Sequence, residues 1–195
     1  MESDRCRWNR RYESDESLSG KNPSPFLVRE IEPVKRLVPG IRALDIACGE
    51  GRNSMFLARH GFRVTGMDIS DAGLDKAVRR SRAEGVVIDF QQVDLEGYRF
   101  TESCDLIINF NFLLRDLFPK AAAVLSPGGV MIIDTIMASP QMCAAHNPAY
   151  LLEPGELWRI CEKLDGEILV YEELPDGEMP TARVLFRKSC TGGPL

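Results

Sequence analysis

The sequence predicts one α/β domain with a doubly wound, mostly parallel, seven-stranded sheet, helices on both faces and a C-terminal antiparallel hairpin. The first reason is that strand-like and helix-like segments alternate from residue 41 onward, as they do around parallel sheets. The second is that only residues 175–180 separate the last two strand-like segments, which leaves no room for a crossover helix. The third is the length, because 195 residues suit one domain with a full hydrophobic core.

Each element follows from its local pattern. The helix predicted at residues 26–38 has apolar side chains at helical spacing, but Pro33 should kink or split it. The strand at 105–110 is continuously apolar and should be buried on both faces. The helix at 119–125 should stop at the Ser-Pro-Gly-Gly turn of residues 126–129, and Pro154 suits the first turn of a last helix. The remaining strands are predicted at residues 41–47, 62–67, 86–93, 130–134, 167–173 and 182–187, and the remaining helices at 52–60, 71–82 and about 157–164.

Composition and charge exclude several classes of protein. A net charge of −5 argues against a clustered basic surface that grips nucleic acid. The N-terminal residues contain no apolar leader, and no apolar run is long enough to span a bilayer. The six cysteines show neither CxxC nor zinc-finger spacing. The sequence therefore predicts a cytoplasmic protein with reduced cysteines, no metal, and no nucleic-acid or membrane partner.

A glycine-rich turn follows the first predicted strand. Gly49 and Gly51 allow a tight turn into the next helix and leave backbone N–H groups open to a ligand. Asp68 ends the second strand, 19 residues after Gly49, where a carboxylate can accept hydrogen bonds from both hydroxyls of a ribose. Asp45 lies just before the glycines, where it suits an ammonium group better than a pyrophosphate. The alternative is an ordinary turn between a strand and a helix.

Three segments resemble motifs of the class I methyltransferases that use S-adenosylmethionine (SAM). Residues 44–53 resemble the first motif, residues 64–70 the second, and residues 125–129 the turn before the fifth strand. The run DIACGEGRNS and the lead-in WNRRY at residues 8–12 are most similar to the tellurite-resistance-type small-molecule methyltransferases. The resemblance covers most of residues 8–187. It implies the class I methyltransferase fold, SAM as the methyl donor and S-adenosylhomocysteine (SAH) as the product.

The resemblance also implies the roles of individual residues. Asp45 and the backbone of residues 47–51 would hold the methionine part of SAM. Asp68 would bind the ribose, while Asp94 and Ile69 would bind the adenine. The predicted cofactor-binding residues are Arg10, Tyr12, Asp45, Ala47, Cys48, Gly49, Gly51, Asn53, Asp68, Ile69, Asp94, Leu95, Asn109 and Phe110.

Some of these residues also have plainer interpretations. Asp94 could simply cap a turn, and Phe110 could belong to the core alone. Tyr12 and Arg10 could fold over the cofactor as a lid, or they could form a structural tail.

The acceptor is predicted to bind to the segments after the fourth and fifth strands, through Phe112, Arg115, Asn147 and Tyr150. Arg115 could bind an anionic substrate in a bidentate manner, or it could pair with Asp116 on the surface. Metalloid oxyanions, thiols and small carboxylates all remain open as acceptors.

No residue stands out as a general base. Similar enzymes often carry His where Leu114 stands, and His60 should lie at the opposite face of the sheet. The catalytic candidates are Arg115, Asp116 and His146, although His146 could also be an exposed loop residue. The sequence therefore favours catalysis by proximity and orientation, with a nucleophile that is reactive at neutral pH.

Two other functions are compatible with the same topology. Ser54 stands where a dinucleotide-binding motif requires Gly or Ala, which counts against a NAD-dependent oxidoreductase. The missing histidine leaves open a non-catalytic SAM-binding or interaction module, and the acidic charge argues against RNA or protein methylation. The sequence thus predicts a SAM-dependent methyltransferase of a small-molecule acceptor. It would have a cap at residues 1–40, a SAM-binding domain at 41–188 and a flexible tail at 189–195.

Overall fold

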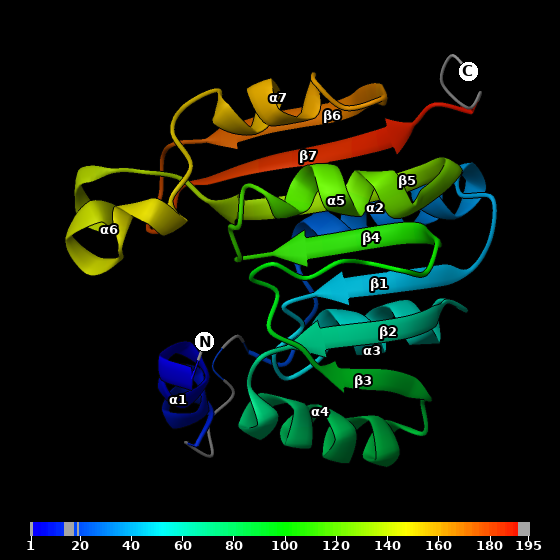
Figure 1. Cartoon of the computed structure of the whole chain (residues 1–195), viewed down its shortest axis with the longest axis vertical. Helices are drawn as coiled ribbons and strands as arrows, with labels where there is room; N and C mark the ends of the chain where they lie inside the picture. Colours follow the sequence, from blue (N-terminus) through cyan, green and yellow to red (C-terminus); the bar gives the residue numbers. More distant parts are fainter. Residues whose placement is uncertain (1, 14–17, 19, 191–195) are drawn as a thin grey trace.

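The structure is a computed structural model that describes residues 2–13, 18 and 20–190. A single twisted sheet runs through it, with helices against both faces (Figure 1). Parts of the cap predicted at residues 1–40 and most of the tail predicted at residues 189–195 lie outside the described residues.

The seven strands lie in the order β3-β2-β1-β4-β5-β7-β6. β1 to β5 pair in parallel, whereas β7 pairs antiparallel with both β5 and β6, which confirms the predicted hairpin. The strands are β1 (Arg42–Ile46), β2 (Arg63–Asp68), β3 (Ile88–Gln92), β4 (Cys104–Phe110), β5 (Leu125–Ile136), β6 (Gly166–Leu174) and β7 (Thr181–Lys188).

The helices cover the two faces of the sheet through two apolar clusters. α2 and α3 pack on one face through residues such as Ile31 and Leu57, and α5 and α7 pack on the other through residues such as Phe118 and Leu157. No helix in the described part of the chain is long and apolar enough to cross a membrane. The helices are α1 (Glu2–Tyr12), α2 (Pro25–Leu37), α3 (Arg52–Arg59), α4 (Asp71–Glu84), α5 (Leu117–Val124), α6 (Pro140–Ala145) and α7 (Glu156–Cys161), with a short 3₁₀ turn, η1 (Pro148–Tyr150).

Several local features differ from the sequence prediction, among them α6 and η1, which were not predicted. α2 is continuous through Pro33, because its buried side chains anchor it to the sheet on both sides of the proline. The turn predicted at residues 126–129 lies within β5, which begins beside Cys104 and shifts register before Leu106. The segment at residues 8–12 belongs to a helix, α1, that the sequence analysis did not predict.

The topology gathers the loops that matter at one edge of the sheet. Because β1 to β5 are parallel, their carboxyl ends meet at the same edge, and the strand order reverses between β1 and β4. The arrowheads of β1 to β4 point to this edge in Figure 1, and α1 and α6 lie beside it. The fold therefore places any ligand site here, between the N-terminal helix and the connection that follows β5.

Candidate functional site

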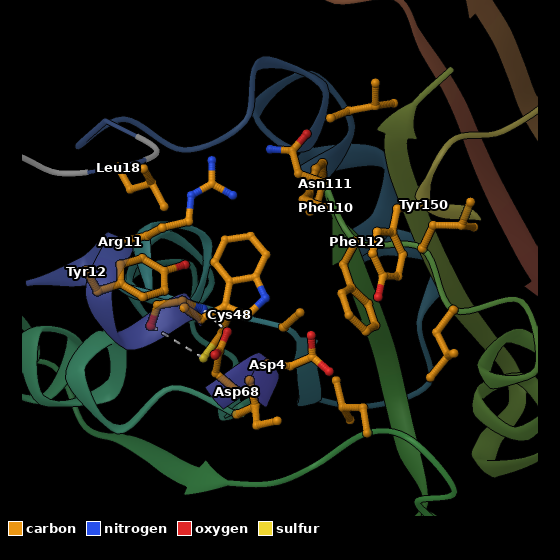
Figure 2. Close-up of a pocket in the computed structure, with 18 of the residues that line it drawn as sticks. Asp4, Arg11, Tyr12, Leu18, Cys48, Asp68, Phe110, Asn111, Phe112 and Tyr150 are labelled. Carbon is orange, nitrogen blue, oxygen red and sulfur yellow. Dashed lines mark hydrogen bonds between the residues drawn. The ribbon is translucent and has the colours of Figure 1, made fainter. Parts of the chain in front are cut away.

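A cavity of about 720 Å³ opens at the carboxyl edge of the sheet. Its walls come from α1 and the residues just after it, from the carboxyl ends of strands β1 to β5 and the segments that follow them, and from the loop between β6 and β7. Figure 2 shows Tyr12, Cys48 and Asp68 on one side of this cavity and Phe112 and Tyr150 on the other. The cavity thus joins the two regions that the sequence analysis assigned to cofactor and acceptor.

The glycine-rich turn after β1 has a backbone that few residue types can adopt. Ala47, Gly49 and Gly51 all have positive φ angles, of 55°, 54° and 73°. The turn is fixed at its base, where the Cys48 amide donates to the carbonyl of Met67 over 2.9 Å. Gly51 starts α3, and a Cβ there would lie 3.1 Å from Ala77, Met55 and Phe90. Gly51 is therefore needed for the turn and the packing beneath it, and it does not line the cavity.

Asp68 holds the glycine-rich turn to the start of α4. One carboxylate oxygen accepts the Gly49 amide at 2.8 Å, and the other accepts the Ser70 amide at 2.9 Å. The side chain is buried, and burial raises its pKa despite these hydrogen bonds. Each carboxylate oxygen has a second lone pair, so the bound carboxylate is oriented and can still accept from a ligand in the cavity.

Asp45 lies at the floor of the same cavity. It is 2% exposed, and one oxygen accepts the Ser54 hydroxyl at 2.5 Å. Burial raises the pKa of Asp45 to about 7, with the charge of Asp68 adding to the rise and the bond from Ser54 opposing it. A buried carboxyl with a raised pKa is stabilised as the anion when a cation binds beside it.

Helix α1 closes the cavity from the N-terminal side. Asn9 fastens it to α4, because its amide donates to Asp71 at 2.7 Å and its carbonyl accepts from Ser70 at 2.7 Å. Tyr12 is 7% exposed and fills the space that two glycines leave, since a Cβ on Gly49 would collide with its hydroxyl and one on Gly73 would lie 3.1 Å from its ring. Burial raises the pKa of the Tyr12 hydroxyl, so it remains a neutral hydrogen-bonding group.

Most of the residues predicted from the sequence lie around this one cavity. The side-chain oxygen of Asn53 already accepts a hydrogen bond from the Ser24 amide at 2.9 Å, which leaves the side-chain NH₂ group as its donor toward a ligand. The predicted residues that line the cavity are Tyr12, Asp45, Ala47, Cys48, Gly49, Asn53, Asp68, Ile69, Asp94, Leu95, Phe110, Phe112, His146, Asn147 and Tyr150.

Besides Gly51, four predicted residues do not line the cavity. Arg10 lies on the opposite face of α1 from Trp8 and Tyr12. Asn109 is buried, and its amide group has no hydrogen-bond partner among the described residues. Asp116 is exposed just before α5.

Arg115, the fourth, stabilises the segment after β5. Its guanidinium pairs with Glu156 at 2.5 Å instead of with Asp116. It also donates to the carbonyls of Ala149 and Leu151 at 2.6 and 2.9 Å. These contacts use the fork of the guanidinium, so Arg115 holds the segment after β5 in place and does not line the cavity.

Several residues that line the cavity were not predicted from the sequence. Asp4, Arg7, Trp8 and Arg11 recur at helical spacing on one face of α1, and this spacing would have identified them had the helix been predicted. Asn111 has a positive φ of 56° directly after β4, which no sequence pattern indicates. The cavity is also lined by Leu18, Gly20, Glu50, Arg52, Val93, Glu96, Leu113, Leu114, Ile136, Ala145, Leu151 and Met179.

The chain has sequence relatives among known proteins. Residues 43–129 match the family described as "Methyltransferase domain". A "Ubiquinone biosynthesis O-methyltransferase" of Nitrosococcus oceani is 34% identical over 109 residues, which make up 52% of this chain and 46% of that protein. The chain spans about half the length of the curated relatives it matches.

Solved structures show the same architecture. TehB from Haemophilus influenzae aligns with a TM-score of 0.68 at 23% identity, over 83% of this chain and 62% of that chain. Magnesium protoporphyrin IX methyltransferase from Synechocystis, solved with bound SAH, aligns with a TM-score of 0.69 at 18% identity, over 96% and 99% of the two chains. At these identities the likeness establishes the fold.

Proposed function

We propose that this chain is a class I methyltransferase that transfers the methyl group of SAM to a small-molecule acceptor, as its matching domain and its fold support. The observation that carries the proposal is the cradle formed by the glycine-rich turn with Asp45 and Asp68. It combines bare backbone, two buried carboxyl groups and a wall where Gly49 admits no side chain. These features suit a nucleoside that carries an ammonium and a sulfonium group.

The residues present fit this cofactor. Asp68 would accept both ribose hydroxyls, and Asp45 would face the ammonium group of the methionine part. Asp94, Leu95 and Ile69 line the cavity beyond the end of β3, on the side where the adenine would lie. SAM supplies an activated methyl group on a positively charged sulfur, and the chain's own residues orient the acceptor and exclude water.

In this proposal the N-terminal segment forms a cap over the cofactor site. Helix α1 covers the glycine-rich turn with Tyr12 and is fastened to α4 by Asn9. Residues 1–40 would thus close over the cofactor held by residues 41–188. A cytoplasmic location is part of the same proposal, and all six cysteines are free thiols.

The geometry also bears on the two rival functions. A dinucleotide motif reserves position 54 for Gly or Ala, whereas here Ser54 donates a hydrogen bond to the buried carboxyl group of Asp45. This arrangement disfavours a pyrophosphate. A non-catalytic SAM-binding module differs from the proposed enzyme only in turnover, so an acceptor assay distinguishes them.

Calorimetry with SAM, SAH and NAD tests the cofactor, and release of SAH in the presence of an acceptor panel tests the activity. The proposal predicts saturable heat for SAM and SAH, none for NAD, and SAH release with at least one acceptor. Binding of NAD but not SAM would contradict it, and SAM binding without turnover of any acceptor would favour the non-catalytic module.

SAM binding should tighten as the pH rises through the pKa of Asp45. The carboxyl group has a pKa of about 7 in the free protein, so at about pH 5.5 it must lose a proton before it can face a cation. Between about pH 5.5 and 7.0, below the ordinary pKa of an α-amino group, the Kd should fall about tenfold. Titrations by calorimetry across this range would measure the slope.

Asp45→Asn provides the matched control. It should bind SAM weakly at every pH and show no such slope. A raised carboxyl pKa means that the fold is favoured by the neutral form and loses stability as the pH rises through about 7. The variant without ligand should therefore be more stable than the parent at alkaline pH, and an unchanged pH slope in the variant would show that another group is responsible.

A further inference from the structure

The charged residues around the cavity are all on one side. Among the described residues, nine charged side chains line it, and every one comes from α1, from β1 or β2, or from the segments that follow β1, β2 and β3. None comes from the segments that follow β4 and β5, or from residue 179 in the loop between β6 and β7. The nine are Asp4, Arg7, Arg11, Asp45, Glu50, Arg52, Asp68, Asp94 and Glu96.

The opposite side, which we call the acceptor wall, is mostly apolar. Figure 2 shows two of its residues, Phe112 and Tyr150, across the cavity from Tyr12 and Asp68. Its only polar side chains, apart from the Tyr150 hydroxyl, are the two amides and one imidazole of Asn111, Asn147 and His146. The acceptor wall consists of Phe110, Asn111, Phe112, Leu113, Leu114, Ile136, Ala145, His146, Asn147, Tyr150, Leu151 and Met179.

Among the described residues, the cation that lies against a ring of this wall, Arg7, is already paired. The guanidinium of Arg7 lies 6.0 Å from the centre of the Tyr150 ring. The same guanidinium forms an ion pair with Asp4 at 2.7 Å, so the two side chains together carry no net charge. Arg115 is nearby in sequence, but Glu156 neutralises it and it does not line the cavity.

Resting on the proposed function, we propose that the methyl acceptor is an uncharged molecule with an aromatic or similarly apolar body, and not an oxyanion or a small carboxylate. An anion on the acceptor wall would lose its hydration without gaining an Arg or Lys side chain from the wall itself, which is costly. A flat apolar body would instead pack against the rings of Phe112 and Tyr150. The structure thereby narrows the three acceptor classes that the sequence left open.

A neutral thiol illustrates the chemistry that this wall permits. A lone pair on the thiol sulfur forms the new bond to the methyl carbon, while the bond between that carbon and the sulfonium sulfur breaks and leaves its electron pair on that sulfur. The thiol proton passes to water, and the products are a thioether and SAH. The acceptor wall contributes orientation to this step, which needs no unpaired cation.

Two benzyl thiols that differ only at the para position test the proposal. One carries a methyl group and the other a carboxylate, and both thiols are largely protonated at neutral pH. Binding to the SAH-saturated protein is measured by calorimetry, and turnover with SAM is measured as SAH release, with selenite and tellurite in parallel. The methyl compound should bind about tenfold more tightly or better, and the oxyanions should show neither binding nor turnover.

A charge added to the acceptor wall should change this preference. Tyr150→Arg adds a cation at a residue that is 41% exposed. It should narrow or reverse the preference for the methyl thiol over the carboxylate thiol, while the Kd of SAM stays the same. Trp158→Arg makes the same kind of change on α7, outside the cavity, at a side chain that is 43% exposed, and it should leave the preference unaltered.

The outcomes separate this inference from the proposed function. Preferred binding of the carboxylate compound, or turnover of selenite or tellurite, would overturn the inference while leaving SAM-dependent methyl transfer intact. Failure of both thiols to bind the SAH-saturated protein would also overturn it. Failure of SAM and SAH to bind at all would instead overturn the proposed function.

Discussion

Asp68→Asn is expected to weaken SAM binding by about a hundredfold or more. The carboxylate would accept both ribose hydroxyls, and hydrogen bonds to a charged group contribute about 1.5–3 kcal/mol each. The amide would also place a donor against either the Gly49 or the Ser70 amide, both of which now donate to Asp68. Calorimetry with SAM and SAH would give the change in Kd.

Asp75→Asn is the matched control for this variant. Asp75 lies on the exposed side of α4, one turn beyond the start of the helix, and does not line the cavity. The Asp75→Asn variant should bind SAM with the same Kd as the parent protein. Thermal unfolding of both variants would show whether Asp68→Asn still folds, and a folded Asp68→Asn protein with unchanged affinity would exclude the assigned role of this carboxylate.

Gly49→Ala should weaken SAM binding at least about tenfold and also destabilise the fold. The residue has a φ of 54°, which costs an alanine about 1–2 kcal/mol. Its new methyl group would collide with the Tyr12 hydroxyl and narrow the cradle that faces the cofactor. Tyr12 belongs to the cap, so its displacement would loosen α1 as well. Thermal unfolding and calorimetry would report the two effects separately.

Gly85→Ala separates the backbone cost from the loss of the cradle. Gly85 has a φ of 67° at the end of α4, and nothing lies within 4 Å of an added Cβ. The Gly85→Ala variant should lose only the stability that a positive φ costs an alanine, and it should bind SAM normally. Equal affinity losses in the two variants would mean that the effect of Gly49→Ala is general destabilisation, and that the cradle does not contact the cofactor.

The central part of the fold could be predicted because its elements are local. The apolar strand of β4, the alternation around it and the short link between β6 and β7 each specify an element without reference to the rest of the chain. Helix α1 escaped prediction because its mean composition is strongly polar and its stability depends on docking against α4. Likewise, the start of β5 depends on pairing with Cys104 and not on its own turn-forming residues.

The candidate site also contains some residues that could be predicted from the sequence and others that could not. Asp45, Gly49 and Asp68 could be found because their spacing reflects a turn and two adjacent strand ends. Arg115 could not be placed, since its partner Glu156 lies 41 residues away in the sequence. The role of Ser54 as a donor to Asp45 was also invisible, because only the folded turn brings them together.

By itself, the sequence determined the α/β architecture, the glycine-rich turn and the acidic residues beside it, because periodicity and short-range turn chemistry are written into neighbouring residues. Only the tertiary structure decided that Tyr12 occupies the space above Gly49, that Arg115 stabilises a loop, and that charge is confined to one side of the cavity. These facts depend on which side chains from distant segments meet at the sheet edge. Such meetings are set by packing over the whole domain, which no local pattern encodes.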